Sequence, residues 1–328
     1  MKMSRLLATV VAASLAGSTV LAAQEPPTTP PAGRGGRGAG GAPPGPPSMG
    51  GGQCSANAFN CPDAVNPLPA PNTVWMEEMT WMDVRDALKA GKTTAIITTG
   101  GMEPNGPWLV TGKHNYVLHA NCDAIARKLG NALCAPIVKF VPEGNYEPPT
   151  SHMMSPGTIS LKEGTFRAML SDIVSSLKVH GFTRIFLIGD SGGNQGGQRY
   201  VADSLNKLWG GKTLVAHLEE YYDYAGVSKH METKGLAGGK SDGLHDDAEI
   251  TLNMMIDDPK SVRLDERLKT KQAMINGVSL TDKKKNLEWA KEIVAFRTQV
   301  TIEAMNKAIA NGGTLPRAPR PGRGGSGN

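Results

Sequence analysis

The stretch TAIITTGGMEPNGPWLVTGKH, residues 94–114, decides the fold class of this chain. Its apolar start, residues 94–98, breaks at Gly100 into a polar loop that carries Glu103 and His114. A strand that ends in a polar loop is typical of an α/β sheet, where sites form beyond the carboxyl ends of the strands. We therefore look for the chemistry of this protein first in this loop.

Strand-like and helical segments alternate along most of the chain. Apolar periodicity, a capping threonine at position 80 and stop signals at Gly130 and Gly181 predict the helices. The helices are expected over 81–90, 114–129, 162–180, 195–209, 245–257 and 283–310, and the strands over 94–99, 133–139, 184–188 and 213–218. This alternation predicts an α/β fold, a single three-layer domain with a mostly parallel sheet covered on both faces.

The two ends of the chain differ in composition from its middle. Much of the glycine (40 residues) and proline (23 residues) lies before about residue 70 and after about residue 312. Segments of that composition bury too little apolar surface to offset the entropy of ordering. We predict a signal peptide over 1–23, a disordered linker over 24–72, the folded domain over 73–311 and a disordered tail over 312–328.

The signal peptide is predicted from two basic residues followed by an apolar run and small residues near position 23. The run is interrupted by Ser, Thr and Gly and is short for a membrane span, so cleavage is favoured over a retained anchor. We expect a secreted or periplasmic protein with no stable membrane insertion after cleavage.

The net charge of +5 does not indicate a nucleic-acid partner. Residues 1–60 and 312–328 hold seven basic residues and one acidic residue, which leaves 28 basic and 29 acidic residues elsewhere. The basicity therefore belongs to the ends, and the folded domain has no electrostatic footprint for nucleic acid.

The four cysteines fall into two pairs along the chain. Cys54 and Cys61 lie at the end of the predicted linker, where an exported chain permits a local disulfide, and the sequence leaves that pairing open. Cys122 and Cys134 lie in a helical and a strand-like context, and we expect both to be buried free thiols.

Four loops carry the side chains that chemistry needs. They cover 103–114, 150–161 with His152 before a Pro-Gly turn, 185–197 with the run GDSGGN, and 243–251 with His245 and Glu249. GDSGG is also the nucleophile segment of chymotrypsin-like proteases, but those are all-β, whereas this run joins a strand to a helix. A glycine-rich turn whose amides can bind an anion is the simpler interpretation.

Taken together, the four loops resemble the creatininase (creatinine amidohydrolase) family over roughly residues 92–265. The resemblance is carried by Glu103-Pro104-Asn105-Gly106-Pro107-Trp108, Ser155-Pro156-Gly157-Thr158-Ile159-Ser160-Leu161, Gly189-Asp190-Ser191-Gly192-Gly193-Asn194 and His245-Asp246-Asp247 with Glu249. Three family ligand positions differ: Asn105 and Ser191 replace histidines, and His114 replaces an aspartate.

The resemblance implies a divalent metal ion, zinc or manganese, which holds and acidifies a water. Because of the replacements we expect one metal, with Glu103 and His114 as ligands and with Asp190 or a carboxylate near His245 as the third. Catalytic roles are expected for His152, His245, Glu249, Asp190 and Ser191, and substrate binding for Asn105, Trp108, Gly192, Gly193 and Asn194.

The predicted function is a metal-dependent hydrolase of a cyclic amide or another C–N bond in a small molecule. Family resemblance also implies a homo-oligomer. Two alternatives stay open at this point. One is a degenerate, non-catalytic binding protein of the same fold, and the other is a metal-independent hydrolase that uses Asp190 or Ser191.

Overall fold

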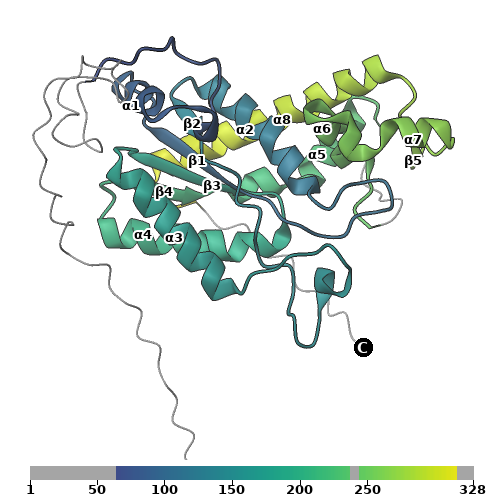
Figure 1. Cartoon of the computed structure of the whole chain (residues 1–328), viewed down its shortest axis with the longest axis horizontal. Helices are drawn as coiled ribbons and strands as arrows, with labels where there is room; N and C mark the ends of the chain where they lie inside the picture. Colours follow the sequence, from purple (N-terminus) through teal and green to yellow (C-terminus); the bar gives the residue numbers. More distant parts are fainter. Residues whose placement is uncertain (1–63, 237–243, 316–328) are drawn as a thin grey trace, which may run out of the picture.

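A sheet of four parallel strands, in the order β2-β1-β3-β4, forms the centre of the protein (Figure 1). The computed structural model describes residues 64–236 and 244–315. The strands are β1 (Thr94–Thr99), β2 (Ala132–Cys134), β3 (Arg184–Gly189) and β4 (Leu214–His217). All their pairings are parallel, which confirms the predicted α/β fold.

Helices cover both faces of this sheet. They are α1 (Trp81–Lys89), α2 (Lys113–Leu129), α3 (Glu163–Val179), α4 (Gln195–Trp209) and α8 (Lys283–Ala310). Side chains of α2 and the second half of α8 pack with Ile96 of β1 in one core cluster. The neighbouring Ile97 points to the other face and packs with α1, α3 and α4. The result is the expected three-layer arrangement.

A smaller helical region lies beside the sheet, at the right of Figure 1. It contains α5 (Tyr224–Thr233), α6 (Ala248–Asp257), α7 (Leu264–Lys269) and the hairpin β5 (Met274–Ile275) and β6 (Val278–Ser279). These elements share a separate core cluster with Ala290 and Ile293 of α8. The long helix α8 thus joins the two cores. The periodicity of the sequence did not predict α5, α7 or the hairpin, all of which are short.

Short 3-10 helices complete the described elements. They are η2 (Met76–Glu78), η3 (Ser151–Met154), η4 (Gly192–Asn194), η5 (Glu219–Tyr222) and η6 (Pro259–Val262). Three of them matter for function, because η3, η4 and η5 all border the pocket described below.

The predicted element boundaries hold where a local signal determines them. Thr80 caps α1 through a reciprocal capping box with Asp83, and Gly130 ends α2 in the left-handed conformation. The strand expected over 133–139 ends at Cys134 instead. Pro136 follows two residues later and has no amide hydrogen for a ladder, so only an isolated bridge at Val138 continues the pairing.

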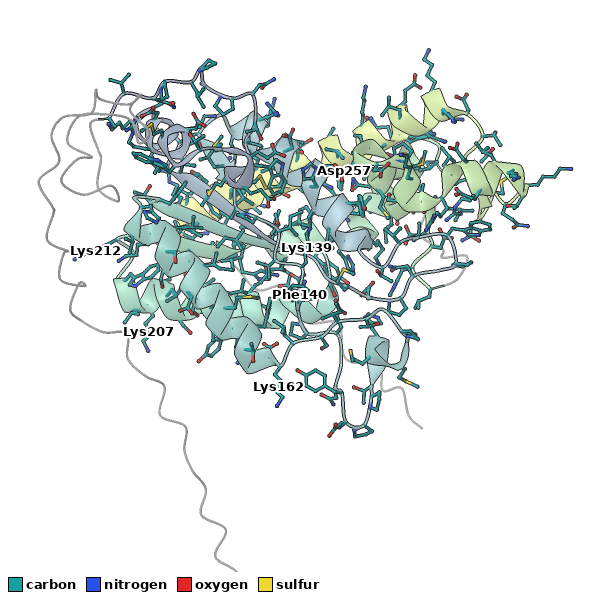
Figure 2. The ribbon with its side chains drawn as sticks, in the orientation of Figure 1. Lys139, Phe140, Lys162, Lys207, Lys212 and Asp257 are labelled. Atoms are coloured by element: carbon teal, nitrogen blue, oxygen red, sulfur yellow. A yellow bond between two sulfur atoms is a disulfide. The ribbon has the colours of Figure 1, made fainter. Side chains whose placement is uncertain are left out.

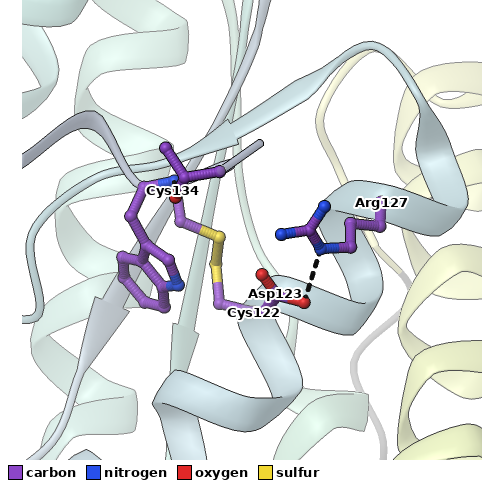
Figure 3. The surroundings of a disulfide bond; sticks show 6 residues. Cys122, Asp123, Arg127 and Cys134 are labelled. Atoms are coloured by element: carbon purple, nitrogen blue, oxygen red, sulfur yellow. Dashed lines mark hydrogen bonds and ion pairs between the residues drawn. A yellow bond between two sulfur atoms is a disulfide. The ribbon is translucent and has the colours of Figure 1, made fainter. Parts of the chain in front are cut away.

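Cys122 and Cys134 form a disulfide, so the prediction of free thiols was wrong (Figure 3). Cys122 points from α2 toward Cys134 on β2, and their Cα atoms are 6.2 Å apart, within the normal range for a disulfide. Both residues are fully buried between helix and sheet. The sequence reveals the burial of each cysteine, but only the packing of α2 on β2 reveals that the two meet.

The predicted signal peptide and most of the predicted linker and tail lie outside the described residues, as do Cys54 and Cys61. The last nine residues of the expected linker, 64–72, are described. Two of them contact α1, since the backbone oxygen of Ala64 accepts a hydrogen bond from Arg85 and the side chain of Asn66 donates one to Asp83. None of the described helices is both long and apolar enough to cross a bilayer.

Basic side chains on the α3 and α4 side of the sheet point away from the core. Lys162, Lys207 and Lys212 are exposed at the periphery of the molecule (Figure 2). Figure 2 also labels Asp257, at the end of α6, whose carboxylate pairs with His119 of α2.

We predict that the Cys122–Cys134 disulfide stabilises the fold. Replacing both cysteines by alanine should lower the free energy of unfolding by about 2–4 kcal/mol, because the unfolded chain loses a cross-link. Urea denaturation of the wild type and the double variant measures this difference. Reducing the unmodified protein should lower its midpoint in the same direction, and equal stability of all three forms would contradict the prediction.

A second stability prediction concerns His217, which is buried at the end of β4 and whose Nε2 lies 2.7 Å from Oε1 of Gln195. Burial, with a smaller contribution from Arg199, lowers the pKa of His217 to about 3 from its ordinary 6.5. The unfolded chain therefore binds a proton below pH 6.5 that the folded chain takes up only near pH 3. The stability from neutral His217 is complete above pH 6.5 and is lost as the pH falls toward 3.

The variant His217→Gln should accordingly show a shallower fall in stability between pH 6.5 and 4 than the wild type, by up to about 1.4 kcal/mol per pH unit. Chemical denaturation across this pH range is the measurement. His180→Gln, at an exposed position, is the matched control and should keep the wild-type slope. Parallel slopes for wild type and His217→Gln would refute the assignment.

Candidate active site and metal centre

A polar pocket of about 930 Å³ opens at the carboxyl edge of the sheet. The loop after β1, the glycine turn after β3 and the segment after β4 converge there, as expected for an α/β sheet. Its lining includes these residues predicted from the sequence: Glu103, His114, His152, Asp190, Ser191, Gly192, Gly193, His245 and Glu249. The volume is that of a small-molecule site.

His114 lies between two carboxylates. Its Nδ1 is 2.8 Å from Oδ2 of Asp190, and its Nε2 is 3.0 Å from Oε1 of Glu103. Burial and the Lys113 ammonium disfavour the charged imidazole, but the contacts with Asp190 and Glu103 outweigh them and raise the pKa of His114. His114 therefore tends to carry a positive charge between two negative ones.

Asp190 is fully buried and already has several partners. Oδ1 accepts hydrogen bonds from Arg297 (2.9 Å) and from the hydroxyl of Tyr224 (2.8 Å), while Oδ2 faces His114. Burial alone would raise its pKa, yet the bond with His114 and the charge of Arg297 lower it. Asp190 is thus a permanently charged anchor that joins α8, α5 and α2.

Glu103 is the point at which this buried chain of charges reaches the pocket. Its Oε1 lies 2.8 Å from the ammonium of Lys113, which is itself only 1% exposed. Burial opposes ionisation of Glu103, but contacts from His114 and His245 hold its pKa below the ordinary value. Glu103 is therefore an ionised carboxylate that is itself almost fully buried.

Two further histidines reach Glu103 from other loops. Nδ1 of His152 is 3.0 Å from Oε2, and Nδ1 of His245 is 3.1 Å from Oε1. The two rings meet edge to face, with centroids 5.4 Å apart. One donor atom from each of Glu103, His152 and His245 lies within 4.8 Å of the others, so this group can hold a metal ion.

The donor set fits a divalent metal ion. One carboxylate with two imidazoles is a known zinc ligand set that leaves a position open for substrate. Oε1 of Glu103 and Nδ1 of His245 are buried, and neither makes a well-aligned hydrogen bond among the described residues. The protein alone thus leaves these atoms without good hydrogen bonds, as is expected of metal ligands.

Glu143 contacts one member of this group, although no sequence motif pointed to it. Its Oε2 is 2.8 Å from Nδ1 of His152. Burial and the charge of nearby Glu103 raise the pKa of Glu143 to about 8. A Cβ atom at Gly101 would lie 2.3 Å from Oε1 of Glu143, so only glycine leaves room for this carboxyl group.

The loop that carries His245 is held against the Glu103 loop. Asp246 accepts a hydrogen bond from the buried Arg267, and a Cβ atom at Gly106 would lie 2.8 Å from its Cβ. His245 itself has φ +57°, the left-handed region that a residue with a side chain rarely adopts. Such local strain persists where surrounding packing enforces it, and it is common at functional sites.

Comparison with known proteins identifies the family. The sequence profile of creatinine amidohydrolase, Creatininase, matches residues 77–307. The chain belongs to the creatininase family. This assignment confirms the resemblance inferred from the sequence, and it places the protein in a family of amidohydrolase-type enzymes.

One curated relative and two solved structures show how divergent this family member is. The 3-dehydro-scyllo-inosose hydrolase of Thermotoga maritima is 27% identical over 172 residues, which span 51% of each chain. The aligned region thus covers about half the length of that relative. A creatininase designated "Creatininase Mn" is 19% identical with a TM-score of 0.51, over 74% of this chain and 100% of its own. A tryptophan-to-alanine mutant creatininase is 18% identical with a TM-score of 0.53 and the same coverage.

Three residues expected to bind substrate do not line the pocket of this family member. The amide of Asn105 donates hydrogen bonds to the backbone oxygens of Glu103 and Val110 and so shapes its own loop. The buried Asn194 donates to the backbone of Thr99 and Gly100 and fastens the glycine turn to β1. The guanidinium of Arg267 lies over the Trp108 ring, with Cζ 5.5 Å from the ring centre. A direct role for them in substrate binding stays a prediction.

The glycine turn supplies space more than contacts. Cβ atoms at Gly192 and Gly193 would lie 3.1 Å from the hydroxyl of Tyr222 and 2.8 Å from the backbone oxygen of Pro142. Ser191 borders the pocket, but no histidine among the described residues is hydrogen-bonded to its hydroxyl, so it lacks an evident base. The predicted ligand roles of His114 and Asp190 and the catalytic role of Ser191 stay predictions.

The segment before α6 contributes two acidic side chains. Asp247 caps α6 by accepting a hydrogen bond from the amide of Ile250, and burial raises its pKa to about 7. Glu249 is buried in the first turn of the same helix and lines the pocket. The sequence pattern indicates a helix N-terminus in this segment, which the structure contains. The catalytic role of Glu249 stays a prediction.

Four residues of the site were missed from the sequence: Lys113, Glu143, Tyr224 and Arg297. Lys113 adjoins His114 and could have been considered with it. Arg297 lies in the middle of α8, more than a hundred residues from Asp190, and no local pattern distinguishes it from an exposed helical arginine. Only the tertiary fold brings these groups together.

We predict that the pair of Arg297 and Asp190 is essential for stability. Arg297→Met should lower the free energy of unfolding by about 3–5 kcal/mol, because it leaves the carboxylate of Asp190 buried without its guanidinium. Chemical denaturation measures the loss. In the double variant with Asp190→Asn the cost should be smaller than the sum of the two single costs. Strict additivity would show that the two side chains do not interact.

Proposed function

We propose that this protein is a metal-dependent hydrolase of a small cyclic amide or a related C–N bond, with its metal ion held by Glu103, His152 and His245. The convergence of these three side chains on one point of a polar pocket carries the proposal. Membership of the creatininase family supports the reaction class. Export and homo-oligomer formation stay predictions.

A divalent ion at this position supplies a Lewis acid that polarises a carbonyl group and acidifies water. The residues of the chain do the rest. Glu103 keeps its negative charge at neutral pH, because His114 and Lys113 stabilise the ionised form. The glycine turn leaves space for the substrate beside Ser191, and it leads directly into the N-terminus of α4, where an anionic group is favoured.

Proton transfer to the leaving group needs an acid close to the pocket. Asp247 and Glu249 both line it and come from the segment that also carries His245. We therefore assign proton transfer to the substrate to Asp247 and Glu249. Asp190, His114 and Lys113 orient Glu103.

A second reaction remains a candidate because of the pocket lining. Tyr222, Tyr224 and Ser228 line it together with several carboxylates, and a lining rich in polar side chains suits a polyhydroxylated ring. The relative named 3-dehydro-scyllo-inosose hydrolase acts on a cyclic compound of that kind. Assay of cyclic amides beside hydroxylated cyclic ketones separates the two possibilities.

Metal binding tests the proposal directly. After treatment with a chelator, the metal-free protein should bind one Mn²⁺ or Zn²⁺ per chain in calorimetry. Glu103→Gln or His245→Ala should weaken that binding at least tenfold, because each removes a ligand. Glu292→Gln, which alters a surface pair with His230, and His119→Asn are matched controls that should bind normally. Hydrolysis should be lost in the same variants that lose the metal. Failure of the wild type to bind either ion would refute the proposal.

A further inference from the structure

One ring nitrogen of His152 faces two carboxylates, that of Glu103 and that of Glu143. The Nδ1 atom of His152 lies 2.8 Å from Oε2 of Glu143 and 3.0 Å from Oε2 of Glu103. Glu143 is 4% exposed and Glu103 is 1% exposed, so water is almost absent around both. Two buried carboxyl groups therefore converge on a single imidazole nitrogen.

The described protein atoms do not supply hydrogen bonds to all the carboxyl oxygens of this arrangement. A ring nitrogen carries at most one hydrogen, which two carboxylates would have to share. Oε1 of Glu143 is buried and accepts no hydrogen bond among the described residues. Lys113, the cation nearest to Glu103, contacts Oε1 of Glu103 and not the oxygen that faces His152. Oε2 of Glu103 is instead paired with His152.

A divalent cation satisfies all of these groups at once. If Nδ1 of His152 binds an ion instead of a hydrogen, the two oxygens closest to that nitrogen face the same ion. Two carboxylates also balance the charge of a divalent ion. The position left for a cation is bounded by Glu103, Glu143 and His152.

The fold holds Glu143 in this position. Its backbone amide donates a hydrogen bond to the hydroxyl of Ser160, and Val141 and Ser160 form a parallel bridge. The adjacent Pro142 packs against the glycine turn at Gly193. Gly101 leaves the space into which the carboxyl group fits. A carboxylate that is positioned from the backbone outward needs little reorganisation to bind a ligand.

We propose that Glu143 is a further protein ligand of the metal ion, so that the site is built from two carboxylates and two imidazoles: Glu103, Glu143, His152 and His245. This inference rests on the proposed metal-dependent function. It also implies a preference among metals. Oxygen-rich sites favour Mn²⁺, whereas Zn²⁺ is satisfied by three protein ligands of which two are histidines.

The test compares Glu143→Gln, Glu143→Asp and Glu103→Gln with the control Glu292→Gln, using calorimetric titration of the chelated proteins with Mn²⁺ and with Zn²⁺. Glu143→Gln should weaken Mn²⁺ binding at least tenfold and Zn²⁺ binding by a smaller factor. Glu143→Asp keeps a carboxylate on a shorter stem and should retain more Mn²⁺ affinity than the glutamine variant. The absorption spectrum of the Co²⁺-loaded protein should also change in Glu143→Gln, because the coordination of the ion changes.

Measurements of stability with and without metal distinguish the loss of a metal ligand from a loss of the folded structure. Without metal, Glu143→Gln should be at least as stable as the wild type in urea denaturation, since it removes a buried carboxyl group beside Glu103. With Mn²⁺, the wild type should gain more stability than this variant.

Two results would overturn the inference in distinguishable ways. Wild-type Mn²⁺ affinity and an unchanged Co²⁺ spectrum in Glu143→Gln, with binding lost in Glu103→Gln, would exclude Glu143 as a ligand and leave the proposed function in place. Absence of metal binding in the wild type would refute both.

Discussion

The structure of this site depends on one buried carboxylate, that of Asp190. It lies beyond β3, pairs with Arg297 of α8, accepts a hydrogen bond from Tyr224 of α5 and contacts His114 of α2. Removing any of these charges from water is costly, and the cost is recovered only if all partners are in place together. The position of Asp190 therefore determines how three helices meet the carboxyl edge of the sheet.

Glu103 connects this structural chain of charges with the reactive pocket. Its two oxygens have different neighbours: Oε1 faces Lys113, His114 and His245, and Oε2 faces His152. The cationic partners keep Glu103 ionised in a place where burial would otherwise favour its neutral form. The pocket consequently has one rigid, charge-balanced wall and a second wall of histidines and acids from more distant loops.

The side chains predicted to replace family metal ligands have local partners in the structure. Asn105 fastens its own loop, and His114 joins two carboxylates, so both side chains are occupied within the protein. His152 and His245 reach Glu103 from two other loops and restore a group of donors suited to a metal ion.

The sequence by itself determined the order of strands and helices, the parallel sheet and the loop that carries Glu103, because these follow from periodicity, caps and glycine stops that act between near neighbours. It also indicated the family and the loops of His152 and His245. Only the tertiary structure decided that Cys122 meets Cys134, that Arg297 holds Asp190 and that Glu143 faces His152. Those contacts join residues on separate elements, and whether two buried groups touch depends on how helices dock on the sheet, which no local pattern in the chain encodes.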